Sequence, residues 1–274
     1  MSSDRYIHGT DPDEQARLSR LNDRLNSACL ARLDLRTGMR VLDVGSGLGQ
    51  MARAIARAVS PGGVVVGVER DAAQRAAAER LAREAAEDRL VEFRAGDALA
   101  LPLGPSETGS FDLVFCRYVL EHLREPERAV AEMVRAARPG GVIALADDDH
   151  GLCHVHPPCP EFEPVWSAYR RAYGALGLDE RVGSRLPELL ERAGARARGC
   201  DFIFFGGCHG APGWEDLVTN VVEVVRTARA DIVAGALMQG EPFDRGLRAL
   251  REWSGRPGAA IWFPVCWAWG VRPR

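Results

Sequence analysis

The chain has 274 residues, of which 46% are apolar and 27% are charged, a composition typical of a soluble globular protein. Its longest uncharged runs, 202–214 and 257–271, are shorter than the roughly 18 apolar residues that a membrane-spanning helix needs. The formal net charge is −3, and like charges form no block or stripe. We therefore expect neither a membrane protein nor a nucleic-acid-binding protein.

The basic residues are all arginine, since the sequence contains no lysine. Mechanisms that depend on a lysine, such as Schiff-base chemistry or a phosphate-binding loop of the P-loop type, are thereby excluded. The seven cysteines are scattered and form no Cys-x-x-Cys pair, which indicates reduced thiols. The N-terminus has no basic start followed by an apolar stretch, so we expect a cytoplasmic protein.

Short apolar runs alternate with helical patterns from residue 39 onward, which predicts a doubly wound, mostly parallel α/β sheet of seven strands. The first five strands are expected at 39–44, 64–68, 90–95, 111–116 and 142–146. Helices are expected at 51–59, 71–86 and 126–138. Asp71, with Gln74 three residues later, predicts a capped start for the second of these helices. The sequence from Arg138 to Gly141, Arg-Pro-Gly-Gly, is expected to separate the third helix from the fifth strand.

The remaining segments are mainly helical additions to this sheet. Residues 1–37 are expected to form a helical lid, and 38–274 the main domain, with pocket-forming insertions at about 150–196 and 208–258. Helical spacing predicts helices at 162–176, 187–193, 214–229 and 243–253. The last two strands are expected at 201–205 and 259–269, with a bulge at Pro264.

A glycine-rich turn, Gly45 to Gly49, joins the first strand to the first helix. Such a turn lets backbone amides approach a ligand, and the helix that follows favours negative charge. Acidic residues stand at corresponding positions, with Asp43 on the first strand, Glu69 at the end of the second and Asp97 after the third. Because parallel strands end at one edge of the sheet, these acids are expected to face one nucleoside-sized ligand. The third glycine, Gly49, comes one residue too early for the G-x-G-x-x-G dinucleotide fingerprint, which counts against NAD as the ligand.

The segment from Val41 to Gly49, VLDVGSGLG, resembles the signature of class I S-adenosylmethionine-dependent methyltransferases. Later segments agree with that family in order, namely Gly96-Asp97-Ala98, Ser110 to Val114 followed by Leu120 to Leu123, and Arg135 to Gly141. The resemblance covers residues 38–148 closely, and it implies a Rossmann-like fold with S-adenosylmethionine as cofactor and S-adenosylhomocysteine as product.

The resemblance also implies roles for individual residues. Glu69 is expected to accept both ribose hydroxyls, Asp97 to read the adenine amino group beside the Ala98 amide, and Asp43 to orient the methionine ammonium. Arg117 is expected to pair with the methionine carboxylate or, alternatively, with Glu121. The full set of expected cofactor-binding residues is Tyr6, Gln15, Asp43, Gly45, Ser46, Gly47, Gly49, Glu69, Arg70, Gly96, Asp97, Ala98, Cys116 and Arg117.

Three histidines that follow the fifth strand, His150, His154 and His156, are candidate catalytic bases because imidazole titrates near neutrality. Positioning of the acceptor alone is the competing explanation for catalysis. Aromatic residues of the insertions, Trp166, Tyr169 and Trp214, are expected to bind the acceptor. The cysteines and histidines between Cys153 and Cys159 match no standard zinc spacing, so we predict no metal.

The sequence therefore predicts methyl transfer to a small, aromatic or apolar acceptor in secondary metabolism. Methylation of a protein or RNA is the first alternative, and an NAD-dependent oxidoreductase is the second. The sequence does not show whether the acceptor atom is oxygen, nitrogen or carbon. It also does not show whether the protein forms a homo-oligomer.

Overall fold

The computed structural model describes residue 23 and residues 25–274, which form two compact units. One is a sheet unit made of residues 26–149, 181–203 and 265–274. The other is a helical unit, whose described parts are residues 23 and 25 and residues 150–180 and 204–264. We expected residues 181–196 within an insertion, but they belong to the sheet unit. No helix among the described residues is long and apolar enough to cross a membrane.

The sheet unit contains a seven-stranded sheet in the order β3-β2-β1-β4-β5-β10-β7. The adjacent strands within the group β1 to β5 are parallel to one another, and β10 is antiparallel to β5. The predicted doubly wound α/β fold is thus confirmed. The strands are β1 (Arg40–Val44), β2 (Val64–Glu69), β3 (Val91–Ala95), β4 (Phe111–Arg117), β5 (Ala137–Asp148), β7 (Arg196–Phe204) and β10 (Pro264–Val271).

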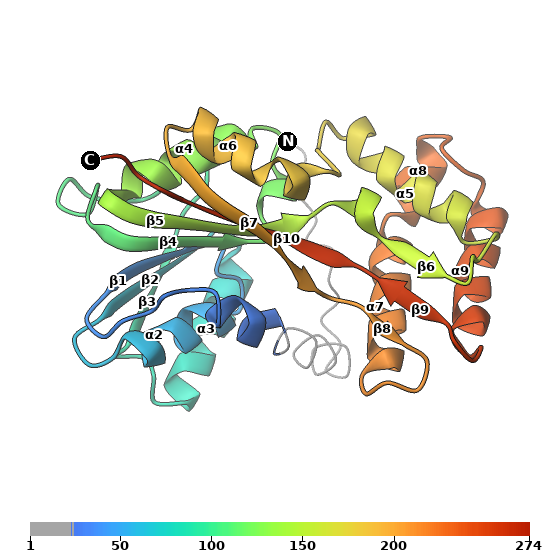
Figure 1. The fold of residues 1–274 in the computed structure, drawn as a ribbon, viewed down its shortest axis with the longest axis horizontal. Coiled ribbons are helices and arrows are strands. Elements are labelled where there is room, and N and C mark those ends of the chain that lie inside the picture. The colour runs from blue at the N-terminus through green and yellow to red at the C-terminus, as the bar shows by residue number, and fades with distance from the viewer. Residues whose placement is uncertain (1–22, 24) are drawn as a thin grey trace. The chain divides into compact units, whose positions relative to one another are not determined.

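Helices cover both faces of this sheet, with α2 and α3 on one side and α4 and α6 on the other (Figure 1). Their bounds are α2 (Gln50–Val59), α3 (Ala72–Glu84), α4 (Pro126–Ala136) and α6 (Leu186–Arg192), with short 3₁₀ helices η1 (Leu120–His122) and η3 (Val182–Arg185). The Asp71 carboxylate accepts a 2.8 Å hydrogen bond from the Gln74 amide, so the predicted cap of α3 is present. Central strands read as continuous apolar runs because both of their faces are buried.

The helical unit has its own hydrophobic core, centred on Phe243, Trp253 and Val225. It consists of η2 (His150–Leu152), α5 (Glu163–Ala175), α7 (Trp214–Thr227), α8 (Arg229–Ala234) and α9 (Gly240–Ser254), with a small antiparallel sheet β6-β9-β8. The strands of this sheet are β6 (His154–His156), β8 (Gly207–Cys208) and β9 (Ala260–Trp262). One face of it packs inward through Val155 and Ile261, which are 8% and 0% exposed.

Several predicted boundaries differ from the observed elements. The predicted strand 259–269 is two strands, because Phe263, directly before Pro264, interrupts the ladder between β9 and β10. The predicted helix 214–229 is likewise divided into α7 and α8. The fifth strand begins at Ala137, so the Arg-Pro-Gly-Gly sequence lies within β5 rather than before it. An irregular register with β4 between Phe111 and Leu113 accommodates these residues.

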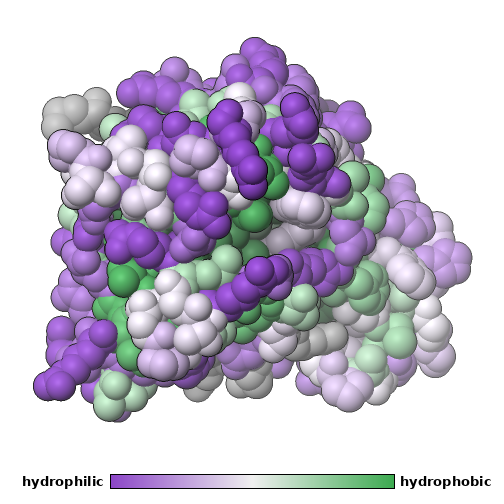
Figure 2. Space-filling model, turned by 60° about the vertical axis from the view of Figure 1, so that its left-hand side comes forward, coloured by the Kyte–Doolittle hydropathy of each residue, from purple (hydrophilic) through white to green (hydrophobic). Residues whose placement is uncertain are grey.

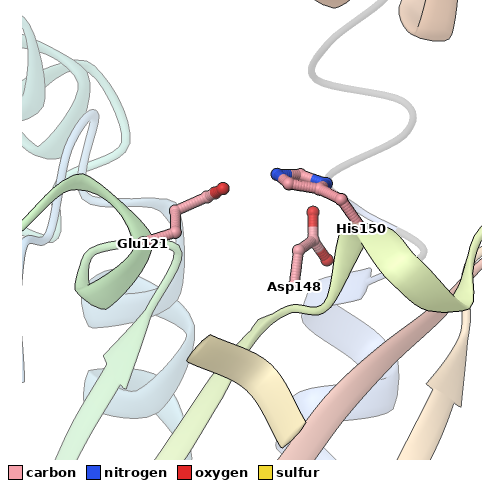
Figure 3. A group of neighbouring side chains, drawn as sticks. All are labelled: Glu121, Asp148 and His150. Atoms are coloured by element: carbon pink, nitrogen blue, oxygen red, sulfur yellow. The ribbon is translucent and has the colours of Figure 1, made fainter. Parts of the chain in front are cut away.

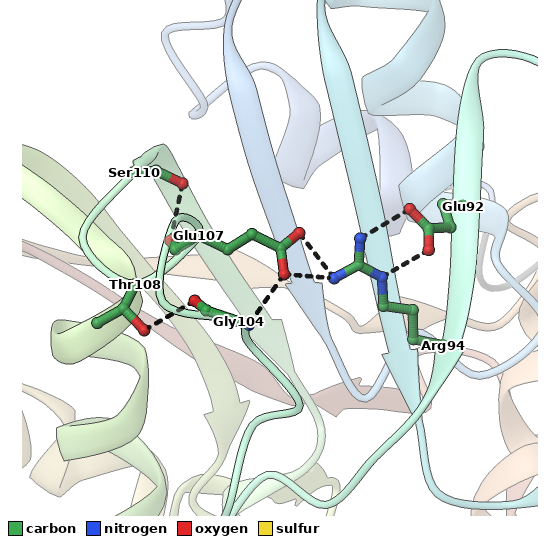
Figure 4. A network of polar contacts seen from close by, with 6 residues as sticks. All are labelled: Glu92, Arg94, Gly104, Glu107, Thr108 and Ser110. Atoms are coloured by element: carbon green, nitrogen blue, oxygen red, sulfur yellow. Dashed lines mark hydrogen bonds and ion pairs between the residues drawn. The ribbon is translucent and has the colours of Figure 1, made fainter.

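Ion pairs attach the loop that follows β3 to the sheet (Figure 4). The Arg94 guanidinium contacts both oxygens of Glu107, at 2.8 and 2.9 Å, and both oxygens of Glu92. The Gly104 amide donates to Glu107 as well, at 3.1 Å. This network fixes the path of the chain between β3 and β4. Arg117, a further candidate site residue, lies at the end of β4.

Candidate functional site

The turn between β1 and α2 requires glycine for steric reasons. Gly45 and Gly49 both have φ of 73°, in the left-handed region that side chains disfavour. A Cβ at Gly45 would lie 2.2 Å from Val119 Cγ2, and one at Gly49 would lie 2.3 Å from the Phe93 ring. The expected close approach of backbone is therefore partly to the protein's own side chains. Gly47 differs, because a Cβ there would meet only the Gln74 amide oxygen, at 3.3 Å.

The N-cap residue of α2 is Gly49, which offers no side-chain cap, and the first turn contains no acidic residue, although the Ala52 amide donates to the Asp43 carboxylate. The first amides of a helix lack partners within the helix and carry partial positive charge. Ser46, in the turn before α2, is 9% exposed, and its hydroxyl makes no hydrogen bond with the described residues. The end of the helix can thus receive polar or anionic groups of a ligand.

Glu69, at the end of β2, closes one side of this turn. Its Oε2 accepts a 2.9 Å hydrogen bond from the Gly47 amide, and its Oε1 accepts a 2.8 Å bond from the Asp71 amide. A carboxylate oxygen can accept two hydrogen bonds, so each oxygen retains capacity for a second donor. Arg70, the next residue, is exposed.

Asp97 lies in the turn after β3. Its Oδ1 accepts a 2.8 Å hydrogen bond from the Leu99 amide, while the backbone of Asp97 pairs with Ala100. The Gly96 amide donates to the Glu69 carbonyl at 3.3 Å, which holds the two acidic turns next to each other. Gly96, Asp97 and Ala98 are all partly exposed, as a ligand-binding turn requires.

Asp43 is the most buried acid of this group, at 3% exposed. Burial raises its pKa to about 7, the nearby Arg117 guanidinium opposes the rise, and the Glu69 charge adds to it. Its Oδ2 is buried and accepts no hydrogen bond from the described residues. A buried carboxylate oxygen that the described residues leave without a donor can receive a cationic or hydrogen-bonding group of a ligand.

Arg117, at the end of β4, has partners that the sequence did not reveal. It donates to the Asn26 side-chain oxygen at 2.7 Å and contacts the Cys29 sulfur at 3.7 Å. Cys116 departs from our expectation, because its thiol lies in the hydrophobic core at 1% exposure, where burial raises its pKa well above the ordinary value. The Cys116 side chain therefore packs inside the sheet unit rather than lining a ligand site.

A second group of acids follows β4 and β5, and Figure 3 shows two of its members, Glu121 and Asp148. Asp147 and Asp148 end β5, and Glu121 lies in η1. Burial and then the Glu121 charge raise the pKa values of both aspartates well above the ordinary value. Asp147 accepts hydrogen bonds from the Val119 and Leu120 amides, at 3.2 and 2.9 Å, and so caps the start of η1. Tyr118 beside them has φ of 56°, a strained value for a non-glycine residue.

The three candidate histidines have different environments. His150, two residues after β5, is 4% exposed and lies in the helical unit among four aromatic rings. The distances from its ring centroid are 4.9 Å to Tyr173, 5.4 Å to Tyr169, 5.8 Å to Trp166 and 6.2 Å to Phe263. His154 and His156 instead lie on the exposed face of β6.

The three aromatic residues expected to bind the acceptor lie in two different environments. Trp166 and Tyr169 belong to the cluster around His150, whose carbonyl accepts a 3.1 Å hydrogen bond from the Trp166 indole. Trp214 packs against Trp253 at 6.1 Å and donates to the Ser254 carbonyl at 2.9 Å. At 5% exposure, Trp214 has the environment of a core residue of the helical unit. The candidates Tyr6 and Gln15 lie outside the described residues.

Comparison with known proteins gives matches to methyltransferases over part of the chain. Residues 42–145 match the family described as a methyltransferase domain. An uncharacterised 37.1 kDa protein in a transposon of Streptomyces fradiae is 34% identical over 197 residues, covering 70% of this chain and 55% of that protein. The 27-O-demethylrifamycin SV methyltransferase of Amycolatopsis mediterranei is 34% identical over 140 residues, covering 51% and 50%.

The matched segments thus span about half the length of these curated relatives. Among solved structures, geranyl diphosphate methyltransferase in complex with S-adenosylmethionine superposes with a TM-score of 0.56 and 17% identity, covering 96% of this chain and 92% of that chain. At this identity the likeness concerns the fold alone.

Proposed function

Because the chain belongs to the class I S-adenosylmethionine-dependent methyltransferases, we propose that it transfers a methyl group from S-adenosylmethionine to a small organic acceptor. The cofactor supplies an electrophilic methyl group on a positively charged sulfur. The observation that carries the proposal is the buried Oδ2 of Asp43 beside the glycine turn, for which the described residues provide no hydrogen-bond donor.

The residues of the sheet unit fit such a cofactor. Asp43 offers a carboxylate to the methionine ammonium, and its burial strengthens a charge-assisted hydrogen bond. Glu69 keeps acceptor capacity for the two ribose hydroxyls and would repel a 2′-phosphate. Asp97 and the Ala98 amide offer an acceptor and a donor to adenine. Arg117, held by Asn26 and Cys29, provides positive charge for the methionine carboxylate.

The helical unit is proposed to recognise the acceptor through the aromatic cluster around His150. Trp166 and Tyr169 would contribute flat apolar surface, which suits an aromatic or polyketide acceptor. His150 would accept the proton of a reacting hydroxyl, and its four aromatic neighbours fix the orientation of its ring. The similarity to a rifamycin-modifying enzyme supports natural-product metabolism as the setting.

A small acceptor is favoured over a nucleic acid by the charge pattern of the surface. Figure 2 shows hydrophilic residues over most of one face, with hydrophobic ones visible between them. On the described surface many arginines are paired with acids, as in Arg229 with Asp244 and Arg192 with Glu127. Paired arginines do not provide the continuous positive stripe that phosphate backbones need.

Cofactor binding tests the proposal directly. Isothermal titration calorimetry with S-adenosylmethionine, S-adenosylhomocysteine and NAD should give saturable binding of the first two only. Replacing Glu69 by alanine removes the acceptor of both ribose hydroxyls, and two such bonds are worth about 1.5–3 kcal/mol each. We expect the affinity to fall on the order of 100-fold or more, whereas Glu84→Ala on the outer side of α3 should leave it unchanged. Binding of NAD without S-adenosylmethionine would contradict the assignment.

A further inference from the structure

Arg117, at the end of β4, is held by groups that carry no charge. Its guanidinium donates to the Asn26 side-chain oxygen at 2.7 Å, contacts the Cys29 sulfur at 3.7 Å and lies 5.7 Å from the centre of the Tyr118 ring. An amide oxygen and a thiol sulfur can accept hydrogen bonds without neutralising the cation that donates them. The contacts of Arg117 with the described residues are thus contacts with neutral groups.

Other arginines of the sheet unit are paired with carboxylates. Arg94 contacts Glu107 at 2.8 Å, and Arg135 contacts Glu132 at 2.7 Å. In such a pair the field of the anion opposes the field of the cation, so little attraction is left for a third charged group. Arg117 is held without this loss, and its positive charge stays available to an anionic group of a ligand.

Asn26 has a fixed position beside Arg117. Residues 26–30 are helical, the Asn26 side chain is 7% exposed, and Cys29, three residues later, is fully buried. Side chains three residues apart on a helix lie on the same face, so Asn26 and Cys29 contact the guanidinium together. A buried side chain has already lost its rotamer freedom on folding, and it can therefore orient its partner at little further entropic cost.

The charge of Arg117 also acts on Asp43, in β1. Burial has the largest influence on the pKa of Asp43 and raises it, the Arg117 guanidinium lowers it, and the Glu69 charge from β2 raises it. The other titratable groups near Asp43 are the Cys29 and Cys116 thiols, whose pKa values are raised by burial. Arg117 therefore connects the position of Asn26 with the ionisation of Asp43.

We propose that Asn26 is a positioning residue for the cofactor, which holds Arg117 in place while leaving its positive charge intact. The inference rests on the proposed function. Arg117 can then pair with the methionine carboxylate while Asp43 pairs with the ammonium group, so that the two residues complement a zwitterionic amino-acid group. A carboxylate at position 26 would also hold Arg117, but it would compete with the carboxylate of the ligand.

Two replacements of nearly equal volume separate the charge of residue 26 from its hydrogen bond. Asn26→Leu removes the acceptor, whereas Asn26→Asp keeps an acceptor and neutralises Arg117. Calorimetry at pH 8 should show that the affinity for S-adenosylmethionine falls about tenfold in Asn26→Leu and about 100-fold in Asn26→Asp. A purely structural asparagine predicts the reverse order, because aspartate preserves the hydrogen bond. The reverse order, or unchanged affinity in Asn26→Asp, would overturn the proposal.

The ligand 5′-methylthioadenosine is the matched control, because it lacks both the ammonium and the carboxylate group. Its affinity should be the same in the unaltered protein and in both Asn26 variants. Ala31→Asp, which places a negative charge on an exposed residue of the turn after the helical segment, should bind both ligands as the unaltered protein does. A parallel loss of both ligands in the Asn26 variants would assign Asn26 to the fold and overturn its positioning role.

The pH dependence of cofactor binding gives a readout that a structural role would not change. Asn26→Asp adds a negative charge near Asp43 and cancels the charge of Arg117. The pH below which the affinity for S-adenosylmethionine falls should therefore rise by about one unit. The rise should be smaller in Asn26→Leu, in which Arg117 keeps its charge. An unshifted profile in Asn26→Asp would overturn the proposal, since residue 26 would then not control the charge at the site.

The same titrations distinguish this inference from the proposed function. If the unaltered protein binds both ligands and Asn26→Asp binds S-adenosylmethionine equally well, the role of Asn26 is overturned and the cofactor assignment stands. If the unaltered protein binds neither ligand, the proposed function is overturned, and the inference about Asn26 with it.

Discussion

The two units present their candidate functional groups in different ways. In the sheet unit, the described part of the chain provides no hydrogen-bond partner for single polar atoms near strand ends, with Asp43 and Asp148 as the clearest cases. In the helical unit, an imidazole is surrounded by packed aromatic rings, and the apolar core extends to them. The first arrangement suits tight recognition of a polar cofactor, because each ligand group completes an existing hydrogen bond. The second suits an acceptor recognised mainly by shape and apolar area.

The largest expected effect is a loss of turnover on replacement of His150, in contrast to the exposed histidines of β6. A general base contributes about 10²- to 10⁴-fold to a rate, so His150→Gln should lower turnover by that amount. The measurement is release of S-adenosylhomocysteine with a panel of phenols and hydroxylated polyketides. His154→Gln is the matched control and should retain turnover. Affinity for S-adenosylmethionine should stay unchanged in both variants. Loss of turnover in His154→Gln alone would move the base to β6.

The second expected effect concerns stability in the sheet unit. An unfolded carboxyl group ionises near its ordinary pKa of 3.8, but Asp43 in the folded chain retains its proton up to about pH 7. Stability is therefore lost as the pH rises from about 4 to 7, and the loss persists above 7. Asp43→Asn should stabilise the ligand-free protein at pH 8 by up to about 4 kcal/mol. Urea unfolding at pH 8 and pH 4 checks this, since the gain should nearly vanish at pH 4.

A stabilising change at a binding site would identify Asp43 as a functional acid rather than a structural one. The same variant should bind S-adenosylmethionine more weakly, because asparagine gives the ammonium no charge. If Asp43→Asn were less stable and bound S-adenosylmethionine with unchanged affinity, the role of Asp43 would be to stabilise the fold instead.

A smaller effect is expected in the pH dependence of cofactor binding. Asp43 must be ionised to pair with an ammonium group, so binding below pH 7 requires release of its proton. The dissociation constant for S-adenosylmethionine should rise about tenfold for each pH unit between 7 and 5. Calorimetry in buffers of different ionisation enthalpy counts the released proton. Asp43→Asn should show neither the slope nor the proton release.

The sequence predicted the sheet unit well because its features are local. The turn around Gly45 and the acid at Glu69 follow strand ends, and strand order in a doubly wound sheet brings such ends together. Even so, the position of the Cys116 thiol in the core was missed, because alternation along a strand buried on both faces does not show which side chains face a ligand.

The helical unit was less predictable because its sites are built by tertiary packing. Nothing in local spacing shows that Phe263, more than 100 residues further along the chain, lies next to His150, or that Trp214 packs into a core with Trp253. Local spacing likewise does not show that Glu121 and Asp148 lie close to each other.

The smallest expected effect uses a fully paired acid as the contrast to Asp43. Burial raises the pKa of Glu107, but hydrogen bonds from Arg94 and the Gly104 amide outweigh it, so that the pKa lies below its ordinary value. A lowered pKa means that this acid stabilises the fold at neutral pH and that its contribution is lost as the pH falls through the folded pKa, below about 4.5.

Glu107→Gln should destabilise the protein by about 1 kcal/mol at pH 7, measured by urea unfolding. Glu92→Gln, whose carboxylate is 58% exposed, should have a smaller effect because solvent screens its pairing with Arg94. We expect Glu107→Gln to lower the free energy of unfolding and Asp43→Asn to raise it. Such opposite changes would show that the sheet unit contains acids that stabilise its fold and acids that are retained for a ligand.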